Sequence, residues 1–208
     1  WYFEDKVGSE PRITAVPEEY REEVALRRAV LVERIAELDD TLTEKFLLGE
    51  PIELEELKAA LRRGVLDNKV VPVFCGSSLR NKGVQLVLDA VVDYLPSPLD
   101  IPPVQGTLVR DGSEVERIAD SSEPLSALVF KIVTDPYMGR LAYIRVYSGK
   151  IKQNGSIHNA TKDKKERVGR LLRMYADHRE DITELSAGEI GAILGLKFSF
   201  TGDTLCDP

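Results

Sequence analysis

The spacing of apolar residues changes near the middle of this 208-residue chain. Up to about residue 95, apolar side chains recur at three- and four-residue steps, which is typical of helices with one buried face. In the second half they alternate with polar side chains, which is typical of half-buried strands. The segment PSPLDIPP at 96–103 separates the two patterns, and its prolines disfavour both helix and sheet. The pattern predicts a mostly helical first part, a boundary at this linker and an all-β second part.

A long helix is expected to begin after Pro17, because proline suits a first helical position and glutamates favour the positive end of the helix dipole. It should run to Leu38, over about 21 residues and roughly 30 Å. Val24, Leu31 and Ile35 fall on the same face as Leu38, and this face is predicted to be buried.

Two shorter helices should follow. Asp39 or Asp40 can cap the second helix, which is expected to stop at Gly49. The third should open at Pro51 and end at Gly64.

A continuous apolar run, from Val70 to Phe74, is rich in β-branched residues and predicts a central parallel strand that is covered on both faces. Gly76 permits a sharp turn, and the apolar stripe in residues 83–95 predicts a helix that Pro96 and Pro98 end. A loop at the carboxyl end of such a strand lies where open α/β sheets bind ligands, although an ordinary strand-to-helix connection has the same pattern. The chain has no G-x-x-x-x-G-K-[ST] phosphate loop.

The second half contains alternating segments that predict strands of a barrel or sandwich, at 125–134, 140–148, 156–160, 166–175 and 188–194. Turn residues support this prediction. The segment 135–139 contains Pro136, and Asn154-Gly155 is the strongest short hairpin signal in the chain. Closure into a barrel would remove exposed strand edges.

The formal net charge of −7 is unevenly distributed. Residues 1–68 hold 17 acidic and 10 basic side chains, whereas residues 150–179 hold nine basic and three acidic ones. A local positive stretch can meet a phosphate backbone or can decorate the outer face of a barrel. Its candidate contacts are Lys162, Lys164, Lys165 and Arg167 on a predicted hairpin. Arg140 and Arg145 on a neighbouring strand are further candidates, with cross-strand pairing as the alternative.

Several function classes are disfavoured by composition. No apolar run is long enough to span a membrane and the first residues do not form a signal peptide, so a cytoplasmic protein is expected. Cys75 and Cys206 are expected to be reduced thiols. His158 and His178 have no partner at a spacing that indicates catalysis, and no metal-ligand pattern is present.

Four segments carry a family resemblance: VPVFCGSSLRNKGVQLVLDAVVDYLPSP at 71–98, FKIVTDPYMGRLAYIRVYSG at 130–149, TKDKKERVGRLLRMYA at 161–176 and GLKFSFTGDTLCD at 195–207. In these segments the chain resembles bacterial elongation factor G, the translocation GTPase of the ribosome. The resemblance implies an α/β remnant of a P-loop GTPase domain in residues 1–98, followed at 99–208 by an all-β Greek-key barrel of the translation-factor domain II type. Within the first part, about 1–68 would be an inserted helical subdomain and 69–98 the last strand, loop and helix.

The resemblance also implies partners. GTP and Mg²⁺ would be cofactors of the parent factor, whose phosphate loop would precede Trp1, so this chain alone should hold no cofactor and be catalytically inactive and monomeric. The backbone N–H groups of Ser77, Ser78 and Leu79 would face the guanine base, with Ser78 in place of the family's usual alanine. The basic residues of the second part would face small-subunit ribosomal RNA, with no role on DNA or membranes. The ribosomal stalk protein would meet the acidic helix start, formed by Glu18, Glu19, Glu22 and Glu23, for which a solvated face is the alternative.

Other readings stay open on sequence alone. Ribosome-protection and release-factor-recycling GTPases carry a similar barrel. A ribosome- or RNA-binding adaptor without the enzyme is a further alternative.

Overall fold

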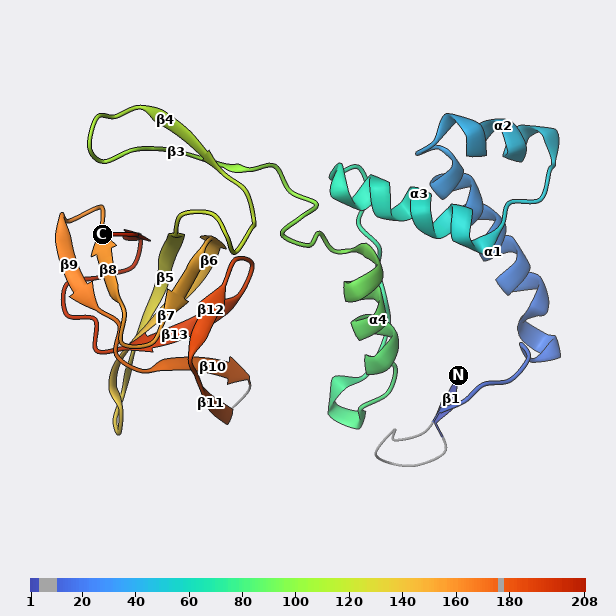
Figure 1. Cartoon of the computed structure of the whole chain (residues 1–208). Coiled ribbons are helices and arrows are strands. Elements are labelled where there is room, and N and C mark those ends of the chain that lie inside the picture. The colour runs from blue at the N-terminus through green and yellow to red at the C-terminus, as the bar shows by residue number, and fades with distance from the viewer. Residues whose placement is uncertain (4–10, 176–177) are drawn as a thin grey trace. The chain divides into compact units, whose positions relative to one another are not determined.

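The computed structural model describes residues 1–3, 11–175 and 178–208. The chain divides into two units, Trp1–Pro96 and Ser97–Pro208 (Figure 1). Each unit has a hydrophobic core of its own. Among the described residues no helix has the length and apolar character needed to cross a bilayer.

The first unit is mainly helical. A two-residue antiparallel pair, β1 (Tyr2–Phe3) and β2 (Pro11–Arg12), precedes the helices. In chain order the helical elements are η1 (Glu18–Tyr20), α1 (Arg21–Ala36), α2 (Asp40–Leu48), α3 (Leu54–Leu66), η2 (Ser78–Arg80) and α4 (Val84–Tyr94).

Local capping explains where α2 begins and ends, as predicted. The Asp39 carboxylate accepts a hydrogen bond from the backbone N–H of Leu42 at 3.1 Å, which satisfies a donor of the first turn. Gly49 follows the helix in the left-handed conformation, with φ of 70°. The prediction that the third helix ends at Gly64 is wrong, because α3 continues to Leu66. A Cβ at Gly64 would lie 2.7 Å from Leu38 Cδ1, so this glycine lets the Leu38 side chain pack closely against α3.

The core of the first unit occupies only the junction of α1, α2 and α3. Its buried side chains are Ile35, Ala36, Leu42, Leu57 and Ala60. The predicted burial along the whole of α1 is therefore wrong, since Val24 and Leu31 are exposed. Along α4, Leu88 and Val92 are likewise exposed. An apolar stripe is buried only where another element faces it, and no described segment of this unit covers these four side chains.

The predicted strand from Val70 to Phe74 is wrong for this chain. The segment has no regular secondary structure, and Val71 and Val73 are 82% and 86% exposed. A parallel strand needs neighbouring strands to pair its backbone N–H and C=O groups, and no described segment of the unit provides one. The Phe74 ring instead stacks on Tyr94 with the ring centroids 6.5 Å apart.

The second unit is all-β, as predicted, and barrel-like. An eight-stranded antiparallel sheet has the order β11-β10-β13-β6-β5-β14-β8-β9, and β12-β7 and β3-β4 form two-stranded sheets. The strands are β3 (Val104–Thr107), β4 (Glu114–Arg117), β5 (Ser126–Asp135), β6 (Gly139–Ser148), β7 (Lys150–Lys152), β8 (Ser156–Asn159), β9 (Lys164–Arg167), β10 (Leu171–Tyr175), β11 (His178–Ile182), β12 (Glu184–Ser186), β13 (Ile190–Leu194) and β14 (Thr204–Cys206). Side chains from the large sheet and from β7 and β12 fill one common core, which includes Val129, Ile144, Ile151, Leu185 and Leu205.

Most predicted strands are present, with two corrections. The expected strand 166–175 is split into β9 and β10 around Gly169. A Cβ at this position would collide with the Leu194 carbonyl oxygen. Asn154-Gly155 does not close a hairpin, because β7 pairs with β12 and β8 pairs with β9 and β14. The turn between β5 and β6 is confirmed, and there the Asp135 carboxylate accepts hydrogen bonds from two backbone N–H groups at 2.9 Å. Six strands were not predicted: β3, β4, β7, β11, β12 and β14.

Candidate nucleic-acid interface

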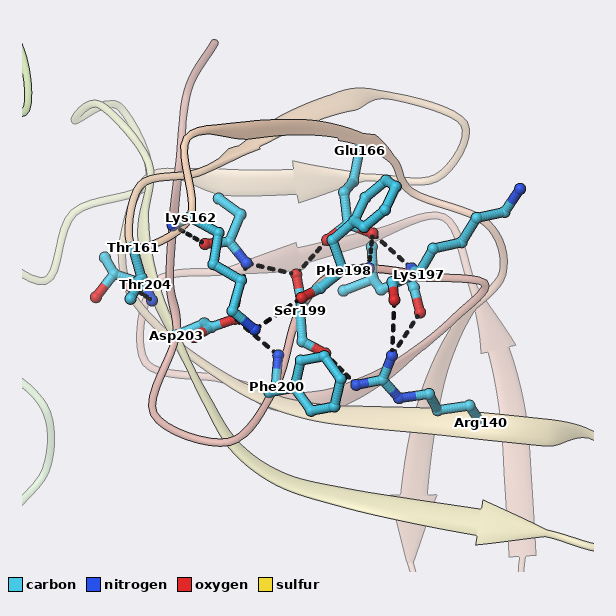
Figure 2. A network of polar contacts seen from close by, with 12 residues as sticks. Arg140, Thr161, Lys162, Glu166, Lys197, Phe198, Ser199, Phe200, Asp203 and Thr204 are labelled. Atoms are coloured by element: carbon cyan, nitrogen blue, oxygen red, sulfur yellow. Dashed lines mark hydrogen bonds and ion pairs between the residues drawn. The ribbon is translucent and has the colours of Figure 1, made fainter.

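A network of buried polar side chains joins the β8–β9 hairpin to the loop between β13 and β14 (Figure 2). Among the described residues, four of the five buried polar or charged side chains lie in this network: Asn159, Glu166, Ser199 and Asp203. Buried polar groups are costly unless they are hydrogen bonded. Their concentration at one place shows that the loop is held by specific polar contacts rather than by apolar packing.

Glu166 on β9 is the first anchor of the loop. Its Oε2 accepts hydrogen bonds from the backbone N–H of Lys197 at 2.5 Å and of Phe198 at 3.0 Å. Its Oε1 accepts a hydrogen bond from the Ser199 hydroxyl. One carboxylate therefore satisfies three consecutive residues of the loop and determines their backbone path.

Asp203 is the second anchor. It accepts hydrogen bonds from Asn159 Nδ2 at 2.9 Å and from the backbone N–H of Phe200 at 2.8 Å, and it pairs with Lys162 Nζ at 3.0 Å. Burial acts to raise the pKa of Asp203, but these hydrogen bonds and the lysine charge outweigh burial and lower the pKa overall. The carboxylate is therefore ionised at neutral pH and holds Lys162 beside the loop.

Two of the predicted RNA-contacting cations, Arg140 and Lys162, support this loop. The Arg140 guanidinium donates to the carbonyls of Lys197, at 3.0 Å, and of Ser199. Lys162 Nζ donates to the Phe198 carbonyl at 2.9 Å. Both cations also lie against the Phe200 ring, with Arg140 Cζ 4.2 Å and Lys162 Nζ 3.9 Å from its centroid. Their first role in this structure is to position the loop.

The other predicted hairpin cations are exposed and unpaired. Lys164, Lys165 and Arg167 lie on β9, the edge strand of the eight-stranded sheet. In the part of the chain that the structure describes, none of their side chains forms an ion pair. Strand alternation places Lys164 on the same face as Glu166, and Lys165 and Arg167 on the opposite face. The edge strand thus carries positive charge on both of its faces.

The loop adds exposed side chains that the sequence reasoning missed. Phe198 and Phe200 are 49% and 54% exposed on either side of buried Ser199, and Lys197 is also exposed. The signal in the sequence was the alternation of Phe, Ser and Phe within GLKFSFTGD, in a segment without a predicted strand. We refer to these exposed residues of the hairpin and loop as the hairpin–loop surface: Lys164, Lys165, Arg167, Lys197, Phe198 and Phe200. It combines unpaired cations with exposed rings on a fixed backbone.

Arg145 is not part of this surface. It lies in the middle of β6, is half-buried and lines a separate cavity of the second unit. The structure therefore does not bring together all six cations that the sequence singled out.

The predicted guanine-facing loop is folded on itself. The backbone N–H of Ser77 donates to the Lys82 carbonyl at 2.8 Å, and the N–H of Lys82 donates back to Ser77 at 3.0 Å. Ser78 and Leu79 begin the η2 turn, and no described residue accepts a hydrogen bond from either backbone N–H. Two of the three predicted donors thus remain available to an external acceptor, whereas the Ser77 donor is occupied.

The predicted stalk-contacting glutamates lie around the start of α1 and are all exposed. Glu18 pairs with Arg21 at 3.0 Å, and Glu23 pairs with Arg27 at 3.4 Å. Exposed pairs of this kind contribute little to stability. The glutamates therefore have no evident structural role, and their contact with the stalk protein stays a prediction.

The described residues contain no group of three or more His, Cys, Asp or Glu side chains arranged to hold a metal ion. His158 has a local partner, with Nε2 at 3.3 Å from Asp163 Oδ1 across the β8–β9 turn.

Comparison with known proteins bears on the second unit directly. Residues 124–208 match the family model of elongation factor G domain 2. The matched range contains β5 to β14 and the entire hairpin–loop surface. A crystal structure of a protein from Thermus thermophilus is similar over 96% of this chain, with 30% sequence identity and a TM-score of 0.73. This chain spans only 27% of that protein. The second unit accordingly has the domain 2 fold of a translation elongation factor.

Proposed function

We propose that this chain is part of a translational GTPase of the elongation factor G type, and that its second unit docks on small-subunit ribosomal RNA through the hairpin–loop surface. The parent factor would hydrolyse GTP to move tRNA and mRNA on the ribosome in the cytoplasm. The observation that carries the proposal is the joint presence of unpaired cations and exposed rings on a fixed loop, within the residues that match elongation factor G domain 2.

The chemistry of this surface suits RNA. Each Lys or Arg that neutralises a phosphate releases condensed counterions. Each such contact therefore adds about one unit to the steepness with which log K falls as log salt concentration rises. The exposed ring of Phe198 can stack on an unpaired base, a contact worth about 1–3 kcal/mol. Because Glu166 and Asp203 already hold the loop, binding would not have to order it, which reduces the entropic cost of association.

The residues of this chain do not fit a complete site for GTP and Mg²⁺. Phosphate binding in this enzyme class depends on a glycine-rich loop with a lysine, and that motif is absent from the sequence. The loop at Ser77–Leu79 would supply one edge of a guanine pocket by its free backbone donors. We assign the phosphate and metal chemistry to the preceding part of the parent factor.

A salt titration tests the RNA contact. Binding of the 208-residue chain to small ribosomal subunits is measured by sedimentation over a series of KCl concentrations. The triple variant Lys164→Gln/Lys165→Gln/Arg167→Gln should lower the slope of log K against log salt by about three units. The matched control removes the same charge from the first unit, in Arg27→Gln/Arg34→Gln/Lys69→Gln, and should keep the wild-type slope. Equal slopes for both triple variants would exclude this surface as the RNA contact.

A further inference from the structure

The second unit contains a cavity on a different part of its surface. The linker residues Pro98, Leu99 and 101–104, the end of β4, the middle of β6 and Gly188 line a volume of about 210 Å³. Most of its wall is apolar, from prolines together with Leu99, Ile101 and Ile118, and Tyr147 contributes an aromatic ring. None of the hairpin–loop residues lines it.

Two arginines that form no ion pair among the described residues line this cavity. Arg117 at the end of β4 and Arg145 in β6 are both half-buried and both line it. In the described part of the chain neither forms an ion pair. Arg117 donates to the Glu116 carbonyl at 3.1 Å, and Arg145 lies over the Tyr147 ring with Cζ 6.0 Å from its centroid.

Other arginines of the same unit form the carboxylate pairs that Arg117 and Arg145 lack. Arg170 pairs with Asp181 at 2.7 Å, Arg173 with Glu189 at 2.8 Å and Arg179 with Asp135 at 2.6 Å. A cation that is withdrawn from water without an anion loses hydration and gains no compensating attraction. Two such cations on one cavity favour the binding of an anion there.

We infer that this cavity binds an organic phosphate monoester of about nucleotide size. A monoester carries a charge of about −1.5 to −2 at neutral pH, which matches two guanidinium groups, whereas a carboxylate brings a single charge. Its oxygens suit the fork of donors that each arginine presents. The ring system attached to the phosphate would contact Tyr147 and the apolar linker residues. This site is independent of the proposed RNA contact, because it shares no residue with the hairpin–loop surface.

Titration of the 208-residue chain with three probes tests the inference. Adenosine 5′-monophosphate should bind at least about ten-fold more tightly than either adenosine or inorganic phosphate, because only the nucleotide occupies both halves of the cavity. Arg117→Gln and Arg145→Gln should each weaken nucleotide binding about ten-fold or more. Arg145→Lys, which keeps the charge and loses the fork, should fall between wild type and Arg145→Gln. The control Lys152→Gln removes an exposed positive charge on β7, outside both the cavity and the hairpin–loop surface, and should bind as wild type does.

Amide chemical shifts locate the site in the unaltered chain, so the test does not depend on how well the variants fold. The amides of Ala119 and Gly188, which line the cavity, should shift with the nucleotide. The inference is wrong if no nucleotide binding is detected up to about 10 mM. It is also wrong if shifts are confined to residues 164–167 and 197–200, or if Lys152→Gln weakens binding as much as Arg145→Gln does.

Discussion

The role of Glu166 in holding the loop gives the sharpest prediction about the second unit. Its buried carboxylate accepts three hydrogen bonds, from two backbone N–H groups and from the Ser199 hydroxyl. Hydrogen bonds to a charged group contribute about 1.5–3 kcal/mol each. Glu166→Gln replaces one acceptor oxygen by an NH₂ group and should lower the free energy of unfolding by about 1.5–3 kcal/mol. Glu166→Ala leaves all three donors without an acceptor and should cost about 3–5 kcal/mol.

Native-state hydrogen exchange measures both the global and the local consequence. The core amides of Ile144 and Ile193 report the stability of the second unit, and the amides of Lys197 and Phe198 report the loop. Both loop amides should exchange at least about ten-fold faster in Glu166→Gln. Glu180→Gln is the control, because Glu180 forms only an exposed contact with Arg173 at 3.8 Å and should change stability by less than about 0.5 kcal/mol. A Glu166→Gln protein that matches this control in core and loop exchange would refute the anchoring role of the carboxylate.

Three further predictions concern pH, nucleotide and the acidic helix. Although burial acts to raise it, the pKa of Asp203 is lowered overall, so Asp203 contributes stability that is present above about pH 4 and is lost as the pH falls through its lowered folded value. Asp203→Asn should therefore reduce the loss of unfolding free energy between about pH 5 and pH 2, and an unchanged acid profile would contradict this. The Ser77–Leu79 loop should not give the chain micromolar affinity for GTP or GDP. One or two hydrogen bonds of about 0.5–1.5 kcal/mol fall well short of the roughly 8 kcal/mol that micromolar binding needs, and a calorimetric dissociation constant near or below about 10 μM would oppose this prediction. Four exposed glutamates lie around the α1 start: Glu18, Glu19, Glu22 and Glu23. In the full-length factor, reversing their charge should slow ribosome-stimulated GTP hydrolysis and leave nucleotide affinity unchanged. An unaltered stimulated rate at low salt would count against the stalk contact.

Features that depend on a few neighbouring residues were readable in the sequence. The start of α2 at Asp39 and its end at Gly49 follow from local hydrogen bonds and a left-handed glycine. The turn at Asp135 likewise uses donors only two and three residues away. Alternation of apolar and polar residues predicted six of the twelve strands of the second unit, because one face of these strands is buried in a common core. The basic character of β9 was also evident from the sequence.

Tertiary structure alone decided which predicted faces are buried and how the candidate site is assembled. Glu166 meets the loop 31 residues further along the chain, and Asn159 meets Asp203 over 44 residues. No local pattern encodes such pairings, which is why the exposed rings of Phe198 and Phe200 were missed. The apolar run from Val70 to Phe74 shows the converse. Its composition favours a strand, but a strand forms only where neighbouring backbone groups complete its hydrogen bonds, and the described residues supply no such neighbours.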